Sequence, residues 1–417
     1  MLKAIRHCLL LMCLCVFLFG CSQERQKFAP AGSMVWETMP ALTYGVLESG
    51  KLQVLPWNSG RCEATSRDTM AETEVGFYHV NIDNHSNYSL FYCDKAAFSN
   101  WVRVCNEPDC EHTASSGCAA VLMSPSFVVK DNRIFYLAQA SAYPELYTGG
   151  GDGLILISCA ANGTDARLEY ALEEAMITDG GRYSTGLTSR FWLYSSSKLT
   201  TGGQYELKTF LVNASGSHLV YSAVSDTKET TLLAPADTFF GLEGESAYIN
   251  MFMDPNLFYR VSGDVLEPVD LSGLETGGAY LSGNVLRCFK QNDGYYDVDL
   301  TTRQEVRLAD ARMENSHCQI MLPNCIVEGT LVTAQSKKDR AEGMTHTLEV
   351  FDGESWRSVT LPPKSKTAGK NVFIYVTAVT SDSILFQCGG MGADHPFYKI
   401  ALGSDNLTLE ACGNKIN

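Results

Sequence analysis

The chain is expected to be all-β, and three observations predict this. It holds 35 glycines among 417 residues, together with 19 tyrosines and 19 phenylalanines, a composition that favours strands joined by tight turns. Helical periodicity is scarce, and the best candidate, Ala166–Met176, also fits a strand followed by a loop. Asp-Gly or Asn-Gly pairs are hairpin signals, since glycine tolerates a positive φ. They recur at Asp152-Gly153, Asn162-Gly163, Asp179-Gly180, Asp293-Gly294 and Asp352-Gly353.

A loose repeat underlies these strands. Apolar opening strands are expected at Arg133–Leu137, Arg190–Tyr194, Ser246–Asn250 and Ser383–Gln387. Closing hairpin strands are expected at Leu154–Ser158, Lys208–Val212, Asn256–Val261, Gly294–Asp299, Thr347–Phe351 and Pro396–Ile400. Corresponding strands lie about 40–55 residues apart, which is the period of propeller blades.

The repeat divides the chain into seven units, at about 75–122, 126–173, 183–224, 230–271, 279–309, 316–361 and 372–412. We therefore predict a seven-bladed β-propeller. Six or eight blades are the alternatives, because the fifth unit is short and Thr43–Trp57 is a further strand pair that either completes the last blade or begins an eighth. A β-sandwich or a two-domain β protein would not explain one unbroken rhythm of about 45 residues.

The N-terminus has the features of a secretory signal. Two basic residues precede an uncharged apolar run that ends at Leu18-Phe19-Gly20-Cys21, and a small residue stands just before the expected cut. This tetrapeptide resembles a bacterial lipobox, in which the cysteine receives a diacylglyceryl group and the chain is cut before it. The lipobox pattern prefers a small residue where Phe19 stands. We expect residues 1–20 to be a signal peptide and Cys21 to be lipidated.

Two other interpretations of this segment stay open. The uncharged run from His7 to Ser22 has 16 residues, fewer than the ~20 that a bilayer-spanning helix needs, which disfavours a retained transmembrane helix. An ordinary cleaved signal would leave Cys21 without a role. We expect residues 21–40, which are polar and rich in turn formers, to be a tether, and residues 41–417 to be the propeller domain. The expected location is the cell membrane, lipid-anchored and facing the extracytoplasmic side.

The charge of the chain restricts its partners. The formal net charge is −15, and removing residues 1–20 takes away Lys3 and Arg6 but no acidic residue, which makes it −17. Such a chain is not expected to bind nucleic acid, whose phosphates need basic partners. Membrane attachment is therefore expected through the lipid on Cys21 and not through charge.

Eleven of the 15 cysteines follow Cys21. They cannot all pair in disulfides, because eleven is odd, although an extracytoplasmic location permits disulfides. The eleven are Cys62, Cys93, Cys105, Cys110, Cys118, Cys159, Cys288, Cys318, Cys325, Cys388 and Cys412.

Three of these cysteines and one histidine form the most distinctive internal feature. Cys105, Cys110, His112 and Cys118 fall within 14 residues, in the spacing C-x4-C-x-H-x5-C. Cys3His is a known structural zinc set, because thiolates and imidazole suit a tetrahedral, borderline-soft ion. Three interpretations stay open: a disulfide-stapled loop with His112 as a local hydrogen-bonding residue, a structural metal clip that holds zinc, and free thiols with a redox or binding role.

The same segment carries a family resemblance. Cys105, Pro108, Cys110, His112, Cys118 and Ala120 match a C-x-x-P-x-C-x-H-x5-C-x-A pattern. With the lipobox and the aromatic strands, the chain resembles a group of predicted β-propeller lipoproteins from Clostridia-like Firmicutes, which often have Asn where Ala119 stands. The resemblance implies a propeller fold and an anchored, extracytoplasmic address. It implies no reaction, because none is assigned to the group.

Catalytic patterns are few. Ser195–Lys198 fits S-x-x-K and Ser404–Asn406 fits S-D-N, as in penicillin-binding enzymes. The two motifs lie more than 200 residues apart, no K-T-G follows, and Lys198 is expected in a Ser/Thr/Gly-rich loop. Asp297-Val298-Asp299 could touch Ca²⁺, although alternating acids on a strand usually form its solvated face. We assign no catalytic residues.

The function expected from these observations is binding without catalysis. A surface-anchored propeller would bind a protein, a peptide or a glycan, and the aromatic loop Tyr143–Asp152 could stack on a sugar or a peptide. The alternatives are an extracytoplasmic glycan-active hydrolase or lyase, and a metal or redox sensor that uses the cysteines and histidine of residues 105–118.

Overall fold

The computed structural model describes residues 62–63, 69–82, 88–95, 101–149, 153–172, 175, 182–187, 190–225, 233–235, 247–251, 254–270, 279–282, 285–290, 293–312, 318–321, 325–329, 346–361, 373–379, 383–389, 397–402, 407 and 409–411. The expected signal peptide, Cys21, the tether and Thr43–Trp57 lie outside these residues. Within the described part of the chain, no helix combines the length and the apolar character that crossing a membrane requires.

The described strands form seven antiparallel sheets, each built from strands that follow one another in the chain. The first sheet contains β1 (Cys62–Glu63), β2 (Thr69–Glu72), β3 (Gly76–Ile82), β4 (Tyr88–Asp94), β5 (Val102–Arg103) and β6 (Val121–Leu122). The second contains β7 (Phe127–Lys130), β8 (Arg133–Gln139), β9 (Leu154–Ala160) and β10 (Arg167–Ala171), with a 3₁₀ turn, Ala140–Ala142, after β8.

The other five sheets each have four strands in chain order. The third contains β11 (Arg182–Leu187), β12 (Trp192–Leu199), β13 (Tyr205–Asn213) and β14 (Gly216–Ser225), and the fourth contains β15 (Leu233–Pro235), β16 (Ala247–Met251), β17 (Asp254–Ser262) and β18 (Val265–Asp270). The fifth contains β19 (Ala279–Ser282), β20 (Val285–Lys290), β21 (Gly294–Asp299) and β22 (Glu305–Asp310). The sixth contains β23 (Cys318–Met321), β24 (Ile326–Gly329), β25 (His346–Phe351) and β26 (Trp356–Leu361), and the seventh contains β27 (Phe373–Val379), β28 (Ser383–Gly389), β29 (Phe397–Ala401) and β30 (Leu409–Ala411).

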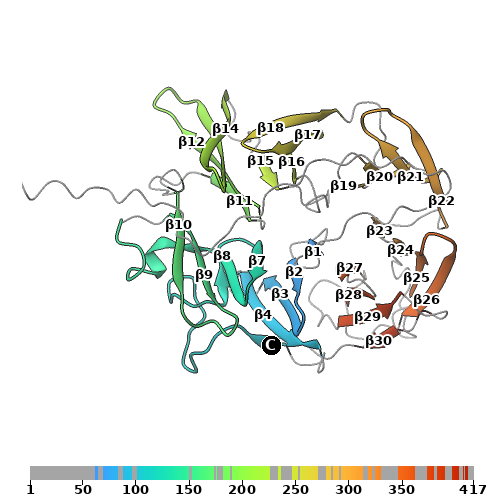
Figure 1. Ribbon diagram of the computed structural model, residues 1–417, viewed down its shortest axis with the longest axis horizontal. Helices are drawn as coiled ribbons and strands as arrows, with labels where there is room; N and C mark the ends of the chain where they lie inside the picture. Colours follow the sequence, from blue (N-terminus) through green and yellow to red (C-terminus); the bar gives the residue numbers. More distant parts are fainter. Residues whose placement is uncertain are drawn as a thin grey trace, which may run out of the picture.

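The sheets are arranged as in a propeller. Figure 1 shows them following one another around a ring, from the blue first sheet to the red seventh sheet. The ends of this series meet, because β1 and β2 of the first sheet contact β27 of the seventh. The all-β class and the propeller arrangement predicted from the repeat are therefore present.

Local turn chemistry explains how neighbouring strands reverse. The hairpin between β7 and β8 turns at Asp131 and Asn132, whose φ angles are 50° and 60°, and Lys130 pairs with Arg133 across it. Two consecutive positive φ angles are those of a type I′ turn, whose twist matches that of the flanking strands. Gly163, in the turn after β9, has a φ of 83°, as the Asn-Gly pair predicts.

Within Ala166–Met176, the strand interpretation and not the helix is found for the first half of the segment. Arg167–Ala171 is strand β10, in which Leu168 pairs with Ile157 and Tyr170 pairs with Leu156. The apolar face that this segment can bury against β9 outweighs its modest helix propensity.

The core lies between neighbouring sheets. Tyr78 and Leu90 of the first sheet pack with Tyr136 and Ile157 of the second. Equivalent clusters join the second sheet to the third, the third to the fourth and the fifth to the sixth. Burying one large apolar side chain stabilises the fold by about 1.5–3 kcal/mol, so these junctions hold the ring together.

Buried charges in the fifth sheet correct one expectation. The Asp297 and Asp299 side chains do not form a solvated face, because Asp297 is 1% exposed and Asp299 is 9% exposed. Arg287 on β20, itself fully buried, donates from Nε to Asp297 Oδ1 at 2.9 Å and from a terminal nitrogen to Oδ2 at 3.0 Å. Asp299 accepts the backbone N–H groups of Thr301 and Thr302 in the next turn.

Candidate metal centre

The outer edge of the first sheet is interrupted by a long excursion. Strands β5 and β6 both pair with β4, on either side of Leu90. Val104 N–H donates to the Leu90 carbonyl at 3.0 Å, and Leu90 N–H donates to the Ala120 carbonyl at 2.8 Å. Residues 104–120, which we call the Cys/His loop, therefore leave and rejoin the sheet at one residue of β4.

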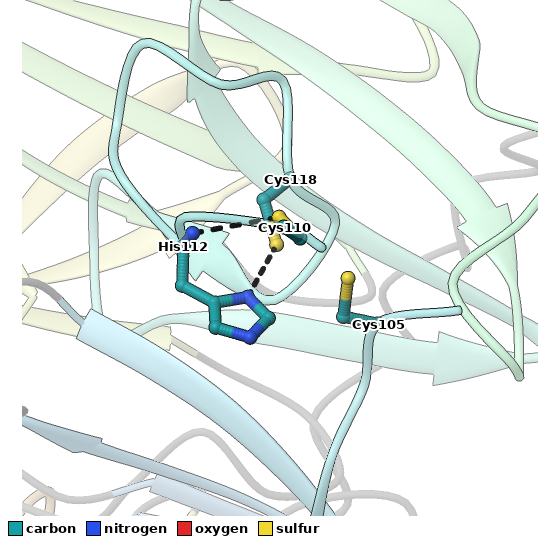
Figure 2. Close-up of side chains that lie close together, drawn as sticks. All are labelled: Cys105, Cys110, His112 and Cys118. Carbon is teal, nitrogen blue, oxygen red and sulfur yellow. Dashed lines mark hydrogen bonds between the residues drawn. The ribbon is translucent and has the colours of Figure 1, made fainter. Parts of the chain in front are cut away.

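The Cys/His loop brings its four expected ligands together. The ligand atoms of Cys105, Cys110, His112 and Cys118 all lie within 4.8 Å of one another, and Figure 2 shows the four side chains gathered at the base of the loop. His112 Nδ1 lies 3.3 Å from Cys118 Sγ. The three cysteines are free thiols in the structure, so it contains no disulfide among them.

Backbone groups also point at the sulfurs. His112 N–H donates to Cys110 Sγ, and Ala120 N–H donates to Cys118 Sγ, both at 3.4 Å. The Cys105 thiol faces the Glu107 carbonyl at 3.8 Å. Hydrogen bonds from N–H groups to sulfur favour the thiolate, which is the form that binds a metal.

The loop is shaped by tight turns and by two residues with positive φ. His112 has a φ of 53° and Gly117 a φ of 63°. Ser116 closes one of these turns, because its Oγ donates to the Thr113 carbonyl at 2.7 Å and accepts Thr113 N–H at 3.2 Å. These turns bring four residues that are spread over 14 positions to one place.

The Cys/His loop also packs against the second sheet. A Cβ added to Gly117 would lie 2.7 Å from the Ala142 carbonyl oxygen, and a Cβ added to Gly163 would lie 2.9 Å from the Val104 carbonyl oxygen. Both distances are too short for a real Cβ, so the two backbones touch. The loop thus bridges the first sheet and two connections of the second.

Burial and hydrogen bonding shift the pKa values of several described thiols in different directions. Burial raises the pKa of Cys159, Cys288 and Cys325 to about 12 each, and burial also raises the pKa of Cys118. At Cys110 burial acts in the same direction, but hydrogen bonds from the His112 N–H and from neighbouring side chains outweigh it and lower the pKa below its usual value. Within the described residues, the thiols that lie together with a histidine as a possible metal donor set are those of the Cys/His loop.

The donor set fits zinc. Zn–S bonds of about 2.3 Å and Zn–N bonds of about 2.0–2.1 Å place tetrahedral donor atoms about 3.5–3.8 Å apart. The separations here reach at most 4.8 Å, so a contraction of about 1 Å or less would complete the tetrahedron. Three exposed acidic residues, Glu107, Asp109 and Glu111, belong to the same loop, and their negative charge favours a cation.

Other expected sites have a different environment from the one predicted. Lys198 lies on strand β12 and not in a loop, and Ser195 Oγ is buried 2.9 Å from Thr209 Oγ1. Tyr143 is not available for stacking on a ligand, because it is buried and its hydroxyl lies 3.1 Å from that of Tyr136. Ser404–Asn406 lies outside the described residues.

A polar cluster that sequence reasoning missed joins the third and fourth sheets. Ser215 Oγ lies 2.8 Å from His218 Nε2 and donates to Asp264 Oδ1 at 2.5 Å. The carboxylate also approaches the same imidazole nitrogen, at 3.5 Å, whereas a catalytic triad needs it at the other nitrogen. No sequence motif marks these residues, because Ser215 and His218, in the turn after β13 and on β14, meet Asp264 only when the turn after β17 comes beside them.

Comparisons with known proteins show no family for this chain. No family model matches the chain, and no curated protein matches it. Solved structures that resemble it include the β-propeller domain of the Trilobed protease from Pyrococcus furiosus, at 8% identity and a TM-score of 0.40, covering 86% of this chain and 98% of that one. Prolyl oligopeptidase B from Galerina marginata is 8% identical with a TM-score of 0.40, and the match covers 88% of this chain and 52% of that one. A puromycin hydrolase is 13% identical with a TM-score of 0.37, and the match covers 84% of this chain and 53% of that one. The chain thus spans about half the length of the two hydrolases, and likenesses this weak carry no argument about function.

Proposed function

We propose that this chain is an extracytoplasmic lipoprotein, held at the cell membrane through Cys21, whose propeller domain binds a protein, a peptide or a glycan without catalysis. The observation that carries the proposal is the ring of antiparallel sheets in Figure 1. A propeller brings the connections of all its sheets to two faces, where side chains from distant parts of the sequence can meet one ligand.

The experiment for binding uses the full chain in detergent micelles. Immobilised protein is screened against peptidoglycan fragments, glycans and a peptide library. Saturable binding of one class, with no change in the mass of the ligand, is the expected result. Chemical conversion of a glycan would favour the hydrolase or lyase alternative, and an absence of saturable binding in all three classes would count against the proposal.

We propose that the seven sheets are the seven blades of one ring within residues 41–417. The contacts of β1 and β2 with β27 support a closed ring, and the predicted repeat units support one sheet per blade. Class averages of single particles viewed along the ring axis should contain seven lobes. Six or eight lobes would contradict this count.

We propose that Cys21 carries the lipid anchor and that residues 1–20 are removed. The lipobox resemblance supports this, as does the similarity to lipoproteins of Clostridia-like Firmicutes. Two acyl chains make attachment stable where one chain alone is reversible. Cells that express the protein should incorporate labelled palmitate into it, and Cys21→Ala should abolish the label and move the chain out of the membrane fraction. A labelled Cys21→Ala chain would refute the assignment.

We propose that the Cys/His loop holds one structural zinc ion through Cys105, Cys110, His112 and Cys118. The donor geometry and the N–H groups aimed at sulfur support this. A metal that joins Cys105 to Cys118 closes a segment of 14 residues, and closing a loop of that length stabilises a fold by about 3 kcal/mol. Metal analysis of the purified chain should give one zinc per chain.

Removing the zinc with a strong chelator should lower the free energy of unfolding by about 3 kcal/mol. The matched control is the Cys159→Ala variant, because Cys159 is a buried thiol of the second sheet outside the donor set. It should keep its zinc, whereas Cys110→Ser should lose it. Equal zinc content in the two variants would contradict the assignment.

A further inference from the structure

The three sulfurs of the Cys/His loop differ in how accessible they are. Cys118 is buried, with 6% of its surface exposed, while Cys105 and Cys110 are partly exposed. All three Sγ atoms lie within 4.8 Å of one another. A small reagent in solution therefore meets Cys105 and Cys110 before Cys118.

Cys105 and Cys110 pack at the edge of a small cluster formed by Cys118, Ala120 and Val121, but the segment that joins them is exposed. The four residues between them, Asn106–Asp109, are all exposed, and one backbone hydrogen bond, from Cys110 N–H to the Glu107 carbonyl, spans them. Cys118 is held more firmly. Its carbonyl accepts Val121 N–H at 3.0 Å, and the preceding Gly117 touches Ala142.

We propose that Cys105 and Cys110 form a peroxide-sensitive site, and that their oxidation to a disulfide releases the metal. The inference deepens the proposed function, because the metal part of it rests on the proposed zinc site. A disulfide needs Sγ atoms about 2.05 Å apart, and the exposed segment between the two cysteines can adjust to that distance without disturbing the core.

The reaction consumes one molecule of hydrogen peroxide. One thiolate sulfur attacks a peroxide oxygen, the O–O bond breaks, hydroxide leaves, and the sulfur becomes a sulfenic acid. The second thiolate attacks this sulfur, the S–S bond forms, and a second hydroxide leaves. The two sulfurs lose two electrons to the peroxide, and two protons from solvent convert both hydroxides to water.

This oxidation removes two of the four donor groups. Cys118 and His112 are left, and two protein ligands are fewer than a structural zinc site uses. The thiols of Cys159, Cys288 and Cys325 are buried in the core, so hydrogen peroxide does not reach them in the folded protein. Among the thiols of the described residues, Cys105 and Cys110 should therefore react first.

The test treats the full chain, purified with its zinc, with hydrogen peroxide. Released zinc is followed with a chromogenic chelator, and disulfides are mapped by mass spectrometry of unreduced peptides. The expected result is one zinc released per chain, at a rate at least tenfold above that of untreated protein, together with a Cys105–Cys110 linked peptide. A phosphine reductant and added zinc should restore the starting state. Linkage through Cys118, or intact thiols with retained zinc, would overturn the inference.

Two controls keep this test separate from the test of the zinc site. Cys159→Ala should react like the unaltered chain, because the buried Cys159 takes no part. A chain prepared without zinc should form the same disulfide with peroxide. If purified protein holds no zinc but forms the Cys105–Cys110 disulfide, the zinc proposal fails and the oxidation site stands. If zinc is present and that disulfide does not form, the inference fails and the zinc proposal stands.

Discussion

Replacing Arg287 by methionine should destabilise the protein by about 3–5 kcal/mol. Arg287 and Asp297 are 0% and 1% exposed and share two hydrogen bonds, of 2.9 and 3.0 Å. The variant leaves the Asp297 carboxylate buried without its charge partner, and this uncompensated charge accounts for the cost. Because domains are stable by about 5–15 kcal/mol, the change should be large in any unfolding assay.

The assay is urea unfolding followed by tryptophan fluorescence, since urea adds no ions that would screen the pair. The matched control is Lys290→Met on the same strand, because Lys290 pairs with Glu305 at 2.6 Å but both side chains are partly exposed. That change should cost about 0.2–1 kcal/mol. The double variant Arg287→Met with Asp297→Leu should recover much of the loss, because no unpaired charge remains. Equal costs for Arg287→Met and Lys290→Met would refute the reasoning.

Two further predictions concern a glycine and a carboxylate. Gly117→Ala should lower the free energy of unfolding by about 1–2 kcal/mol because of its left-handed backbone, and by a further 1–3 kcal/mol because of the contact with the Ala142 carbonyl. The control is Gly263→Ala, since Gly263 has a φ of 59° but nothing lies within 4 Å of its added Cβ, so it should show the backbone cost alone. Equal urea midpoints for the two variants would contradict the contact at Gly117. At Asp352 burial acts to raise the pKa, but hydrogen bonds from its own turn and the Arg357 charge outweigh it and lower the pKa from 3.8. The resulting stability is present above the unfolded value and is lost as pH falls through the folded one. In the Asp352→Asn variant, the urea midpoint should therefore fall less steeply between about pH 5 and pH 3 than in the unaltered chain. An equally steep fall in the variant would argue against a stabilising role of the Asp352 carboxylate.

Strands and turns could be predicted from the sequence because their signals are local. The expected Arg133–Leu137 lies within β8 and the expected Leu154–Ser158 lies within β9, since apolar runs bounded by turn residues carry this information in a few positions. Ala166–Met176 was ambiguous, because it fitted both a helix and a strand followed by a loop. Its side chains favour a helix in isolation, and only the neighbouring strand β9 makes the extended form better.

Contacts across sheets could not be predicted in the same way. The pattern of alternating acids at Asp297 and Asp299 is the pattern of a solvated face, and nothing near them in the sequence shows that Arg287 lies opposite Asp297. The cluster of Ser215, His218 and Asp264 was missed for the same reason. Charge pairs depend on register and on sheet packing, and neither is readable from one segment.

The Cys/His loop lies between these two cases. Its ligand spacing is local, so Cys105, Cys110, His112 and Cys118 could be named from the sequence. Its position depends on Leu90, whose N–H and carbonyl join the two ends of the loop to the sheet, and this required the structure. Both bonds join backbone groups and use no cysteine or histidine side chain. Loss of the proposed zinc, or the proposed oxidation of Cys105 and Cys110, should therefore leave the strands of the first sheet in place.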